Sequence, residues 1–204
     1  MPLKILAFTD IHASRTALEK IAQKIEKHKP DLLVCCGDIS IFENGLEHTL
    51  RKINDLGVRC LLIHGNHEDE TLTGALCGKL KHLIFLHKKT VEIDGTLFVG
   101  HGGGGFAYED EDFDTWAKTL EPTMKKSGRV VLVTHQPLHH TKTDEIYGGE
   151  HVGSKSYRRF VMKMTKSLKL VLSGHIHECF GAVDNVNGVC VSNPGPQGKM
   201  YVIH

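Results

Sequence analysis

Short apolar runs alternate with amphipathic segments in the first third of the chain. The run at 4–8 ends in a polar motif, and the segment 15–28 that follows has apolar residues three and four positions apart. That spacing gives a helix one buried face, and Ser14 is its expected N-cap. A second apolar run follows at 32–36, then a second amphipathic segment at 45–56 and a third apolar run at 58–63. Apolar strands separated by helices predict parallel pairing with both faces of the sheet covered.

The rest of the chain alternates shorter strands, hairpins and one long amphipathic helix. Asp94-Gly95 and Asn187-Gly188 stand between apolar runs, and both dipeptides are typical of tight hairpin turns. The expected strands here are 84–86, 90–93, 96–99, 129–134, 168–173, 179–183, 189–192 and 199–203, with a helix at about 116–126. We find no linker and no internal repeat, so the pattern predicts one domain over 1–204 with mixed sheets.

Five short polar clusters stand where apolar runs end. They are Asp10-Ile11-His12, Gly37-Asp38, Gly65-Asn66-His67-Glu68, His135 and Gly174-His175-Ile176-His177. The carboxyl ends of parallel strands form a shared rim, so we expect the five clusters to meet at one edge of a sheet. Asp, His and Asn supply the oxygen and nitrogen ligands that hold catalytic divalent metals. The clusters therefore predict seven ligands, enough for two ions if one carboxylate bridges them.

The charges of this ligand set suit an anionic substrate. Two divalent ions carry four positive charges, and the carboxylates of Asp10 and Asp38 offset two of them. The two charges that remain match an anion and a metal-activated hydroxide. Two ions roughly 3.5–4 Å apart activate the nucleophile and stabilise the phosphoryl oxygens during displacement. A protonated His beside the leaving group completes such a site as a general acid.

The order Asp-x-His, Gly-Asp, Gly-Asn-His-Glu, His and Gly-His-x-His resembles the calcineurin-like metallophosphoesterase superfamily, and within it the small single-domain phosphodiesterases of prokaryotic type. All five blocks occur in this order between positions 10 and 177. The resemblance implies an α+β or four-layer α/β fold, a double β-sandwich of two mixed sheets flanked by helices. It also implies a metal site at the carboxyl ends of the strands.

The resemblance assigns a role to each of these polar residues. One implied metal site is formed by Asp10, His12, Asp38 and His177. The other is formed by Asp38, Asn66, His135 and His175, so that Asp38 bridges two ions. His67 is implied to be the catalytic residue that is not a ligand, as general acid or phosphate contact, and Asn66 also faces the substrate. The implied cofactors are two divalent ions per chain, which are manganese, iron, zinc, nickel or cobalt.

One block departs from a pattern of the same superfamily. The serine/threonine protein phosphatases read Gly-Asp-x-x-Asp-Arg, where the Asp supports the catalytic His and the Arg grips a phosphate dianion. In this chain Ile41 and Phe42 stand at those two positions. A monoester dianion loses a charge-assisted bidentate contact without the Arg, whereas a diester monoanion depends on it less. The departure favours phosphodiesters, unless an Arg from elsewhere reaches the site: Arg15, Arg158 or Arg159.

Two loops, at 102–114 and 136–155, have no role that the sequence defines. Gly102–Gly105 is not followed by Gly-Lys-Ser or Gly-Lys-Thr, so a phosphate-binding P-loop is not expected. We expect a flexible loop near the metal rim instead. His139 and His140 follow His135 and are either surface residues or part of a lip that contacts substrate. Glu68 is expected to support a loop or a ligand by hydrogen bonding.

Composition narrows the class of protein. The net charge is +1 and there is no dense Lys/Arg tract, so neither bulk nucleic-acid binding nor membrane attachment is indicated. No apolar run approaches the ~20 residues that span a bilayer, and 1–9 is a strand rather than a signal peptide. The six cysteines have no CxxC spacing and are expected to be buried, reduced thiols. These features predict a soluble, cytoplasmic protein whose partner is a small phosphoester substrate.

The leading functional prediction is a metal-dependent phosphodiesterase that hydrolyses a small diester, such as a cyclic nucleotide, with a hydroxide activated by two metals. The alternative is a phosphomonoesterase, a protein phosphatase or a nuclease of the same superfamily. A third class is a non-catalytic scaffold on the same fold. A scaffold predicts eroded ligands, whereas all seven ligands and His67 are present in this chain.

Overall fold

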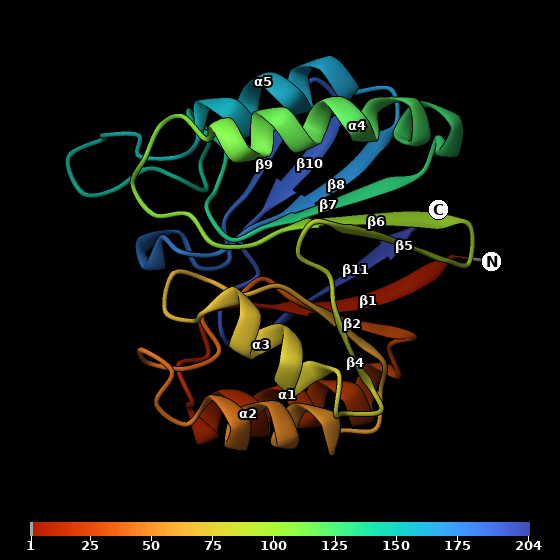
Figure 1. The fold of residues 1–204 in the computed structure, drawn as a ribbon, viewed down its shortest axis with the longest axis vertical. Coiled ribbons are helices and arrows are strands. Elements are labelled where there is room, and N and C mark those ends of the chain that lie inside the picture. Colours follow the sequence, from red (N-terminus) through yellow and green to blue (C-terminus); the bar gives the residue numbers. More distant parts are fainter. Residues whose placement is uncertain (1) are drawn as a thin grey trace.

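The computed structural model describes residues 2–204, and in it two β-sheets lie face to face between two groups of helices (Figure 1). The helices are α1 Arg15–His28, α2 Leu46–Asn54, α3 Glu70–Cys77, α4 Glu111–Ser127 and α5 Lys155–Met164. The strands are β1 Leu3–Phe8, β2 Leu32–Cys35, β3 Cys60–Leu62, β4 Leu83–Phe85, β5 Lys89–Ile93, β6 Thr96–His101, β7 Val130–Thr134, β8 Leu168–Leu172, β9 Val183–Val186, β10 Val189–Ser192 and β11 Lys199–Ile203.

Both sheets are mixed, as expected. The first has the order β11-β1-β2-β3-β4, in which β1 to β4 are parallel and β11 pairs antiparallel with β1. The second has the order β5-β6-β7-β8-β10-β9, with antiparallel pairs at its two edges. Its inner strands β6, β7, β8 and β10 are parallel. Parallel strands place their carboxyl ends on one side, which matters for the site.

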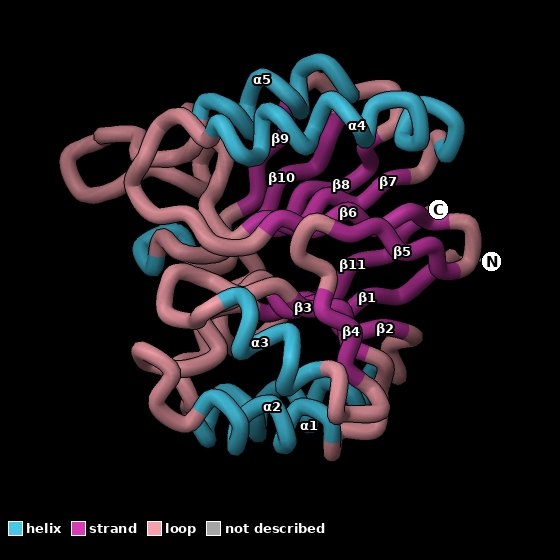
Figure 2. Tube along the Cα trace, viewed as in Figure 1, coloured by secondary structure: helices cyan, strands magenta, loops and turns pink. Residues whose placement is uncertain are grey.

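The helices and strands form four layers in the order helices, sheet, sheet, helices (Figure 2). The inner core lies between the sheets and includes Ile5 and Val34 from the first and Phe98 and Val131 from the second. A second core lies between the first sheet and the helices that cover it, and a third lies between the second sheet and α4 and α5. The expected double β-sandwich flanked by helices is confirmed. Because the inner strands β2 and β3 are covered on both faces, they are apolar throughout.

Several local predictions are confirmed at the level of single residues. Ser14 caps α1, where its Oγ accepts a hydrogen bond of 3.3 Å from the amide of Ala17. Asp94 and Gly95 have φ of +48° and +70°, and Asn187 and Gly188 have +49° and +90°. Two successive residues with positive φ form the type I′ turn that matches the twist of a hairpin. Both expected hairpins are therefore present.

The strand expected at 179–183 is wrong. His177–Cys179 form a short 3₁₀ helix, and β9 begins only at Val183. Cys179 is buried in a small cluster with Ile176 and Val152, outside the sheets. Gly181, with φ of +85°, then turns the chain toward β9. The apolar residues of this stretch are buried by a local cluster, which the sequence pattern does not distinguish from burial in a sheet.

Two helices were not predicted from the sequence, α3 and α5. Each begins at a capping residue: Asp69 accepts a hydrogen bond from Leu72, and Ser154 accepts one from Tyr157. No helix of residues 2–204 is both long and apolar enough to cross a membrane. The six cysteines form no disulfide in the described chain, as expected, and only Cys190 is not fully buried.

Candidate metal centre

The polar clusters come together at one end of the sandwich, and both sheets contribute. Asp10, Asp38 and Asn66 follow β1, β2 and β3 of the first sheet, whereas His135 and His175 follow β7 and β8 of the second. The expectation of one edge of a single sheet is therefore wrong. The two sheets lie face to face, and the loops that follow their parallel strands meet at the same end (Figure 1). The site lies between two sheets rather than along one.

The backbone at the site is strained. Asp10, His12, Asp38 and His175 have φ of +52°, +44°, +50° and +70°, in the left-handed region that side chains other than glycine rarely adopt. Such residues persist only where the surrounding structure holds them, and they concentrate at functional sites. Close approach adds to the constraint, because a Cβ on Gly65 would overlap Oδ1 of Asp38. The local structure is thus built around the positions of these side chains.

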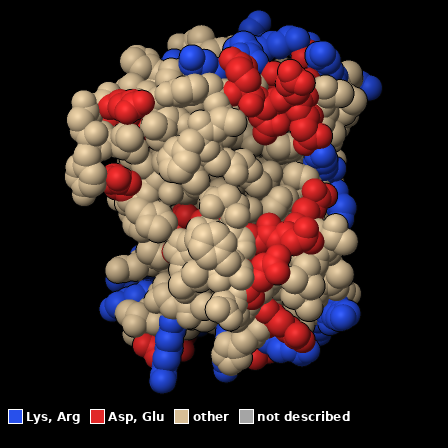
Figure 3. Space-filling model, turned by 60° about the vertical axis from the view of Figure 1, so that its left-hand side comes forward, with Lys and Arg blue, Asp and Glu red and all other residues tan. Residues whose placement is uncertain are grey.

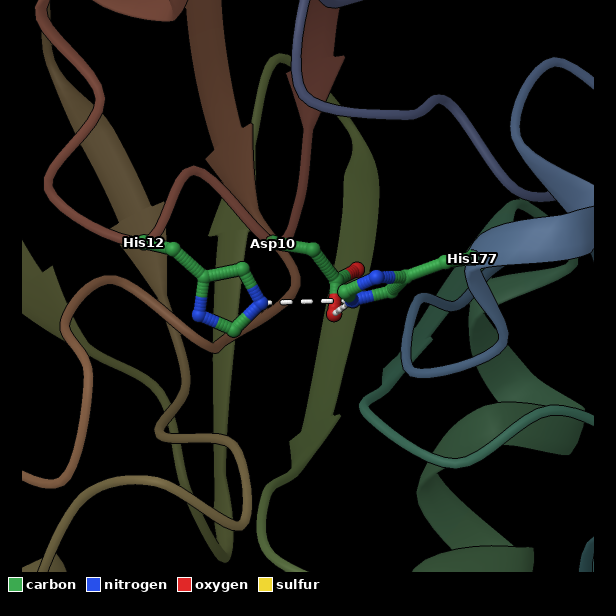
Figure 4. Close-up of side chains that lie close together, drawn as sticks. All are labelled: Asp10, His12 and His177. Atoms are coloured by element: carbon green, nitrogen blue, oxygen red, sulfur yellow. Dashed lines mark hydrogen bonds and ion pairs between the residues drawn. The ribbon is translucent and has the colours of Figure 1, made fainter.

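Asp10, His12 and His177 form the first cluster, and Figure 4 shows the three side chains pointing toward one another. Nδ1 of His12 lies 3.0 Å from the carbonyl oxygen of Ser40, which can only accept, so Nδ1 carries the proton. Nε2 of a neutral His12 therefore presents a lone pair. Nε2 of His12 lies 3.2 Å from Nε2 of His177. That nitrogen of His177 in turn lies 3.6 Å from Oδ1 of Asp10. The three donor atoms converge on one point.

Asp38, His135 and His175 form the second cluster, to which Asn66 adds an amide oxygen. Nδ1 of His135 donates a hydrogen bond of 2.8 Å to the carbonyl of Cys36. Its Nε2 lies 3.0 Å from Oδ1 of Asn66 and 3.4 Å from Oδ1 of Asp38. As in His12, the backbone contact occupies Nδ1 of His135, and Nε2, which faces the Asp38 carboxylate, remains available to a cation.

Asp38 lies between the two clusters. Its Oδ1 belongs to the second cluster, and its Oδ2 lies 3.9 Å from Nε2 of His12 in the first. The carboxylate is buried, with 2% of the residue exposed. Its position matches that of a ligand shared by two ions.

In the second cluster the protonation of Asp38 and that of His135 depend on each other. Burial alone would raise the pKa of Asp38, but the hydrogen bond and charge of His135 outweigh burial and hold that pKa at about 2. Burial would lower the pKa of His135, but the Asp38 carboxylate raises it to about 9. A proton thus neutralises the carboxylate in the protein alone. For His175, burial and then the charge of His135 lower the pKa to about 4, so its ring is neutral near pH 7 and able to bind a metal.

The donor set fits two divalent ions on this geometry. Two carboxylates, four imidazoles and one amide oxygen face inward, and His12 and His135 have the outer ring nitrogen fixed by a backbone carbonyl. Such hydrogen bonds set the tautomer and orientation of histidines that bind metals. Nε2 of His175 is buried and has no hydrogen-bond partner among residues 2–204. Nitrogen and carboxylate donors together suit transition metals such as zinc, iron and manganese.

His67 has the opposite tautomer. The amide N–H of Phe42 lies 3.4 Å from Nδ1 of His67, so Nδ1 accepts and Nε2 carries the proton of the neutral ring. Nε2 lies 3.8 Å from Oδ2 of Asp38, at the same end of the sandwich. The ring of Phe42 stacks on the His67 ring with centroids 4.3 Å apart. A neutral His67 therefore points a hydrogen-bond donor toward the metal cluster, whereas neutral His12 and His135 rings point acceptors.

Glu68 joins two of the loops that bear the donors. Its Oε1 accepts hydrogen bonds from the amide and the hydroxyl of Ser40, at 2.8 and 2.9 Å, and its Oε2 accepts one of 2.9 Å from the amide of Gly65. The expected supporting role is confirmed. A further support, which the sequence did not indicate, is Thr9, whose hydroxyl donates a 2.6 Å hydrogen bond to Oδ2 of Asp10.

A cavity of about 680 Å³ opens beside the clusters. No Lys or Arg is among its lining residues, which are Asp38, Asn66, His67, Phe106, Ile146, Tyr147, His175, Ile176, His177 and Glu178. On the face of the molecule in Figure 3, the Lys and Arg side chains lie mainly at the margins, and the centre is largely uncharged with acidic side chains around it.

The arginines that the sequence offered as substitutes point elsewhere. Nε of Arg15 pairs with Glu19 at 2.8 Å. Arg159 pairs with Glu109 and Asp114 at 2.7 and 2.8 Å. Arg158 lies 3.4 Å from the carbonyl oxygen of His140. None of the three lines the cavity.

The structure does not bring His139 and His140 to the cavity. His139 and His151 lie 3.7 and 2.8 Å from the buried carboxylate of Asp144, and the rings of His140 and His151 are 4.6 Å apart. Asp144 also accepts hydrogen bonds from the backbone of its own loop, at His140, Thr141 and Gly153. These histidines surround the anchor of the loop 136–155, so substrate contact by His139 and His140 stays a prediction without support from this geometry.

Comparison with known proteins identifies the family. The model of the calcineurin-like phosphoesterases matches residues 3–179, which is most of the chain and includes all five polar clusters. The chain belongs to the calcineurin-like phosphoesterase family. A calcineurin-like phosphoesterase is a hydrolase of phosphoesters, and the family typically binds two divalent ions, for which the His and Asp clusters described above are suited.

This calcineurin-like phosphoesterase is similar to other proteins in sequence or in fold. An uncharacterized protein of Methanocaldococcus jannaschii is 28% identical over 99% of this chain and 91% of its own length. A crystal structure of a Thermus thermophilus protein has a TM-score of 0.75 at 14% identity, covering 97% of this chain and 91% of that one. A dimetal phosphatase from Danio rerio has a TM-score of 0.68 at 11% identity, covering 93% and 86%. At these identities the two structures show a shared fold.

Aromatic residues around the cavity of this calcineurin-like phosphoesterase were missed from the sequence. Phe106 follows the glycine run 102–105 and places its ring 4.7 Å from that of His175, which confirms that this loop runs near the site. Tyr147 comes from the loop 136–155 and also lines the cavity. Nothing in the periodicity marks either residue, because both stand in loops.

Proposed function

We propose that the protein hydrolyses phosphodiesters, and favours small ones such as cyclic nucleotides, at a centre of two divalent ions. Asp10, His12, Asp38 and His177 would hold one ion, and Asp38, Asn66, His135 and His175 the other. When bound, the ions would supply an activated water nucleophile and neutralise charge on the phosphoryl oxygens. The convergence of the donor atoms of these residues supports the assignment.

The protein's own residues would complete the chemistry. Nε2–H of His67 donates a hydrogen bond to a phosphoryl or leaving-group oxygen, since the amide of Phe42 holds Nδ1 as an acceptor. Asn66 lines the cavity and contacts the substrate as well as an ion. Full proton transfer from His67 requires a second proton on Nδ1, which breaks the hydrogen bond to Phe42. The geometry thus favours hydrogen-bond donation by His67 over general acid catalysis.

The preference for diesters is carried by the absence of a cationic side chain from the cavity lining. Phe42 stands where related protein phosphatases have an Arg, and Arg15, Arg158 and Arg159 are engaged elsewhere. A monoester dianion carries a second negative charge, and no cationic side chain of the cavity lining would balance that charge. The carboxylate of Glu178 would repel the dianion. A diester carries one negative charge, which suits this cavity.

A paired assay tests the proposal. We expect metal-loaded protein to hydrolyse bis(p-nitrophenyl) phosphate with a higher kcat/KM than p-nitrophenyl phosphate, in parallel assays with manganese and with zinc. Protein stripped of metal should hydrolyse neither substrate until a divalent ion is added back. A higher kcat/KM for the monoester would overturn the preference, and no hydrolysis of either ester after reconstitution would overturn the enzymatic role.

A further inference from the structure

Three histidines of the site each have an aromatic ring against them, and the three rings come from different loops. Phe42 stacks on His67 with centroids 4.3 Å apart. The ring of Phe106 lies 4.7 Å from that of His175, and the ring of Phe180 lies 4.8 Å from that of His177. Tyr147, on a fourth loop, lines the same cavity. Phe106 and Tyr147 therefore line the cavity, and Phe42 and Phe180 lie against two histidines of its wall.

These rings are exposed to solvent to an unusual extent. The exposed fractions of Phe42, Phe106 and Tyr147 are 75%, 66% and 88%. Among the described residues, large exposed hydrophobic side chains elsewhere are scattered over helices and strand edges, for example Met162 on α5 and Val202 on β11. A local group of exposed aromatic rings beside a cavity marks a binding surface rather than ordinary surface composition.

The charges around the cavity restrict what these rings bind. Among residues 2–204 no Lys or Arg lines it, and its acidic residues are Asp38 and Glu178. A substrate with several phosphates would meet no protein cation beyond the proposed ions and would be repelled by Glu178. A phosphodiester with one negative charge and an uncharged, planar substituent meets neither difficulty. The N–H groups of a nucleobase also suit the carboxylate of Glu178 as acceptor.

We propose that Phe42, Phe106 and Tyr147 form an aromatic clamp for a nucleobase, so that the substrate is a phosphodiester of a nucleoside with a single negative charge. This inference rests on the proposed function, since it names the group attached to the phosphate hydrolysed there. A cavity of about 680 Å³ has the size of sites that enclose small ligands. Stacking on an aromatic side chain tolerates any base, because every base has a π-face.

The test compares two diesters with the same leaving group and the same charge: the p-nitrophenyl esters of thymidine 5′-phosphate and of methyl phosphate. Stacking of one base predicts a kcat/KM about 5- to 100-fold higher for the thymidine ester. Phe106→Ala and Tyr147→Ala should each reduce that ratio severalfold, and Met162→Ala, on the outer surface of α5, should leave it unchanged. Calorimetric titration of metal-loaded protein with thymidine 5′-phosphate and with methyl phosphate measures the same preference without turnover.

The outcomes separate the clamp from the catalytic proposal. Equal kcat/KM for the two diesters, or equal affinity for the two phosphates, would overturn the clamp and leave the phosphodiesterase intact. Absence of turnover would count against the phosphodiesterase, while the titration would still decide the clamp. Phe106→Leu distinguishes stacking from simple apolar contact, because Leu keeps apolar surface but has no π-face. If Phe106→Leu kept the full preference that Phe106→Ala lost, an aliphatic substituent rather than a base would occupy the site.

Discussion

The amide N–H of Phe42 donates a hydrogen bond of 3.4 Å to Nδ1 of His67. At His12 and His135 the backbone contact is reversed, because Nδ1 donates to a carbonyl oxygen. The backbone thus divides the histidines of one site into two kinds. In their neutral form, His12 and His135 turn a lone pair toward the cluster, as metal ligands do, and the neutral His67 turns an N–H toward it.

This division predicts different consequences for neighbouring substitutions. His67→Ala should lower kcat by about 10²- to 10³-fold and leave the bound metal unchanged, because it removes a hydrogen-bond donor to the substrate but no ligand. Asn66→Ala should lower both turnover and metal retention, because Asn66 has its amide oxygen in the second cluster. Metal content by mass spectrometry and kcat are measured on the same preparations. His28→Ala, an exposed histidine on α1, serves as control. Metal loss from His67→Ala as large as that from Asn66→Ala would contradict the division.

The same relationship predicts the effect of returning a cation to position 42. Phe42→Arg should lower the ratio of diester to monoester kcat/KM, because a guanidinium beside His67 balances the second charge of a monoester dianion. Phe42→Leu is the matched control, since it removes the ring without adding charge while its amide N–H still reaches His67. The two ratios are measured with the paired p-nitrophenyl esters. An equal change in both variants would show that charge at this position does not set the preference.

Most of the fold could be predicted from periodicity, and the misses have physical causes. The inner strands β2 and β3 are covered on both faces and are apolar throughout, so runs such as Leu32–Cys35 are easy to recognise. The helix α5 has buried residues at Tyr157, Phe160, Val161 and Met164, which is helical spacing that the sequence carried but the prediction overlooked. The 3₁₀ helix at His177–Cys179 had no such signal, because its apolar residues fill a local cluster.

Glu68 gives a test of how the site is held together. Glu68→Gln replaces one of the two accepting carboxylate oxygens with an NH₂ group. The amide N–H of either Ser40 or Gly65 then meets a second donor instead of an acceptor. The loss of a buried, charged acceptor should lower the free energy of unfolding by about 1–3 kcal/mol. Urea denaturation of metal-free protein measures this without a contribution from the ions. Glu92→Gln, on an exposed position of β5, should change stability by less than about 0.5 kcal/mol. Equal free energies of unfolding for the two variants would show that Glu68 does not stabilise the loops that bear the donors.

His87 predicts an acid dependence of stability away from the metal donors. Burial, and then the charge of His64, lower the pKa of His87 to about 3, and Nδ1 accepts a 2.8 Å hydrogen bond from the amide of Gly102. The unfolded ring has a pKa of about 6.5, so below that pH the unfolded chain takes up a proton that the folded protein does not. This one residue should cost roughly 2 kcal/mol of stability between pH 7 and pH 5.

His87→Asn isolates this contribution, because Asn keeps an acceptor for the Gly102 amide but does not titrate. The free energy of unfolding is measured by urea denaturation at pH 7 and pH 5 for both proteins, without metal. We expect the variant to lose less stability than the original protein by roughly 2 kcal/mol. The same loss in both would mean that His87 does not cause the acid sensitivity.

The convergence of the polar clusters could be predicted from the sequence, but the surroundings of the candidate site could not. Asp10, Asp38 and His135 follow apolar strands, and that placement is visible in the sequence. The sequence did not show that two sheets would share the site, because strand order depends on contacts between distant segments. Phe106 and Tyr147 lie in loops, where no periodicity signals which side chain will face a cavity. The specificity of the site is thus the part that required the structure.

The proposed function requires that the converging donors hold two divalent ions, with Asp38 shared between them. Metal content tests this requirement in protein that is stripped of metal, reconstituted with manganese or zinc and freed of excess ion. We predict about two ions per chain for the original protein, as in two-metal hydrolases, and loss of tight binding of both in Asp38→Asn. A content of one ion or none in the original protein, or two tightly bound ions in Asp38→Asn, would contradict the shared centre.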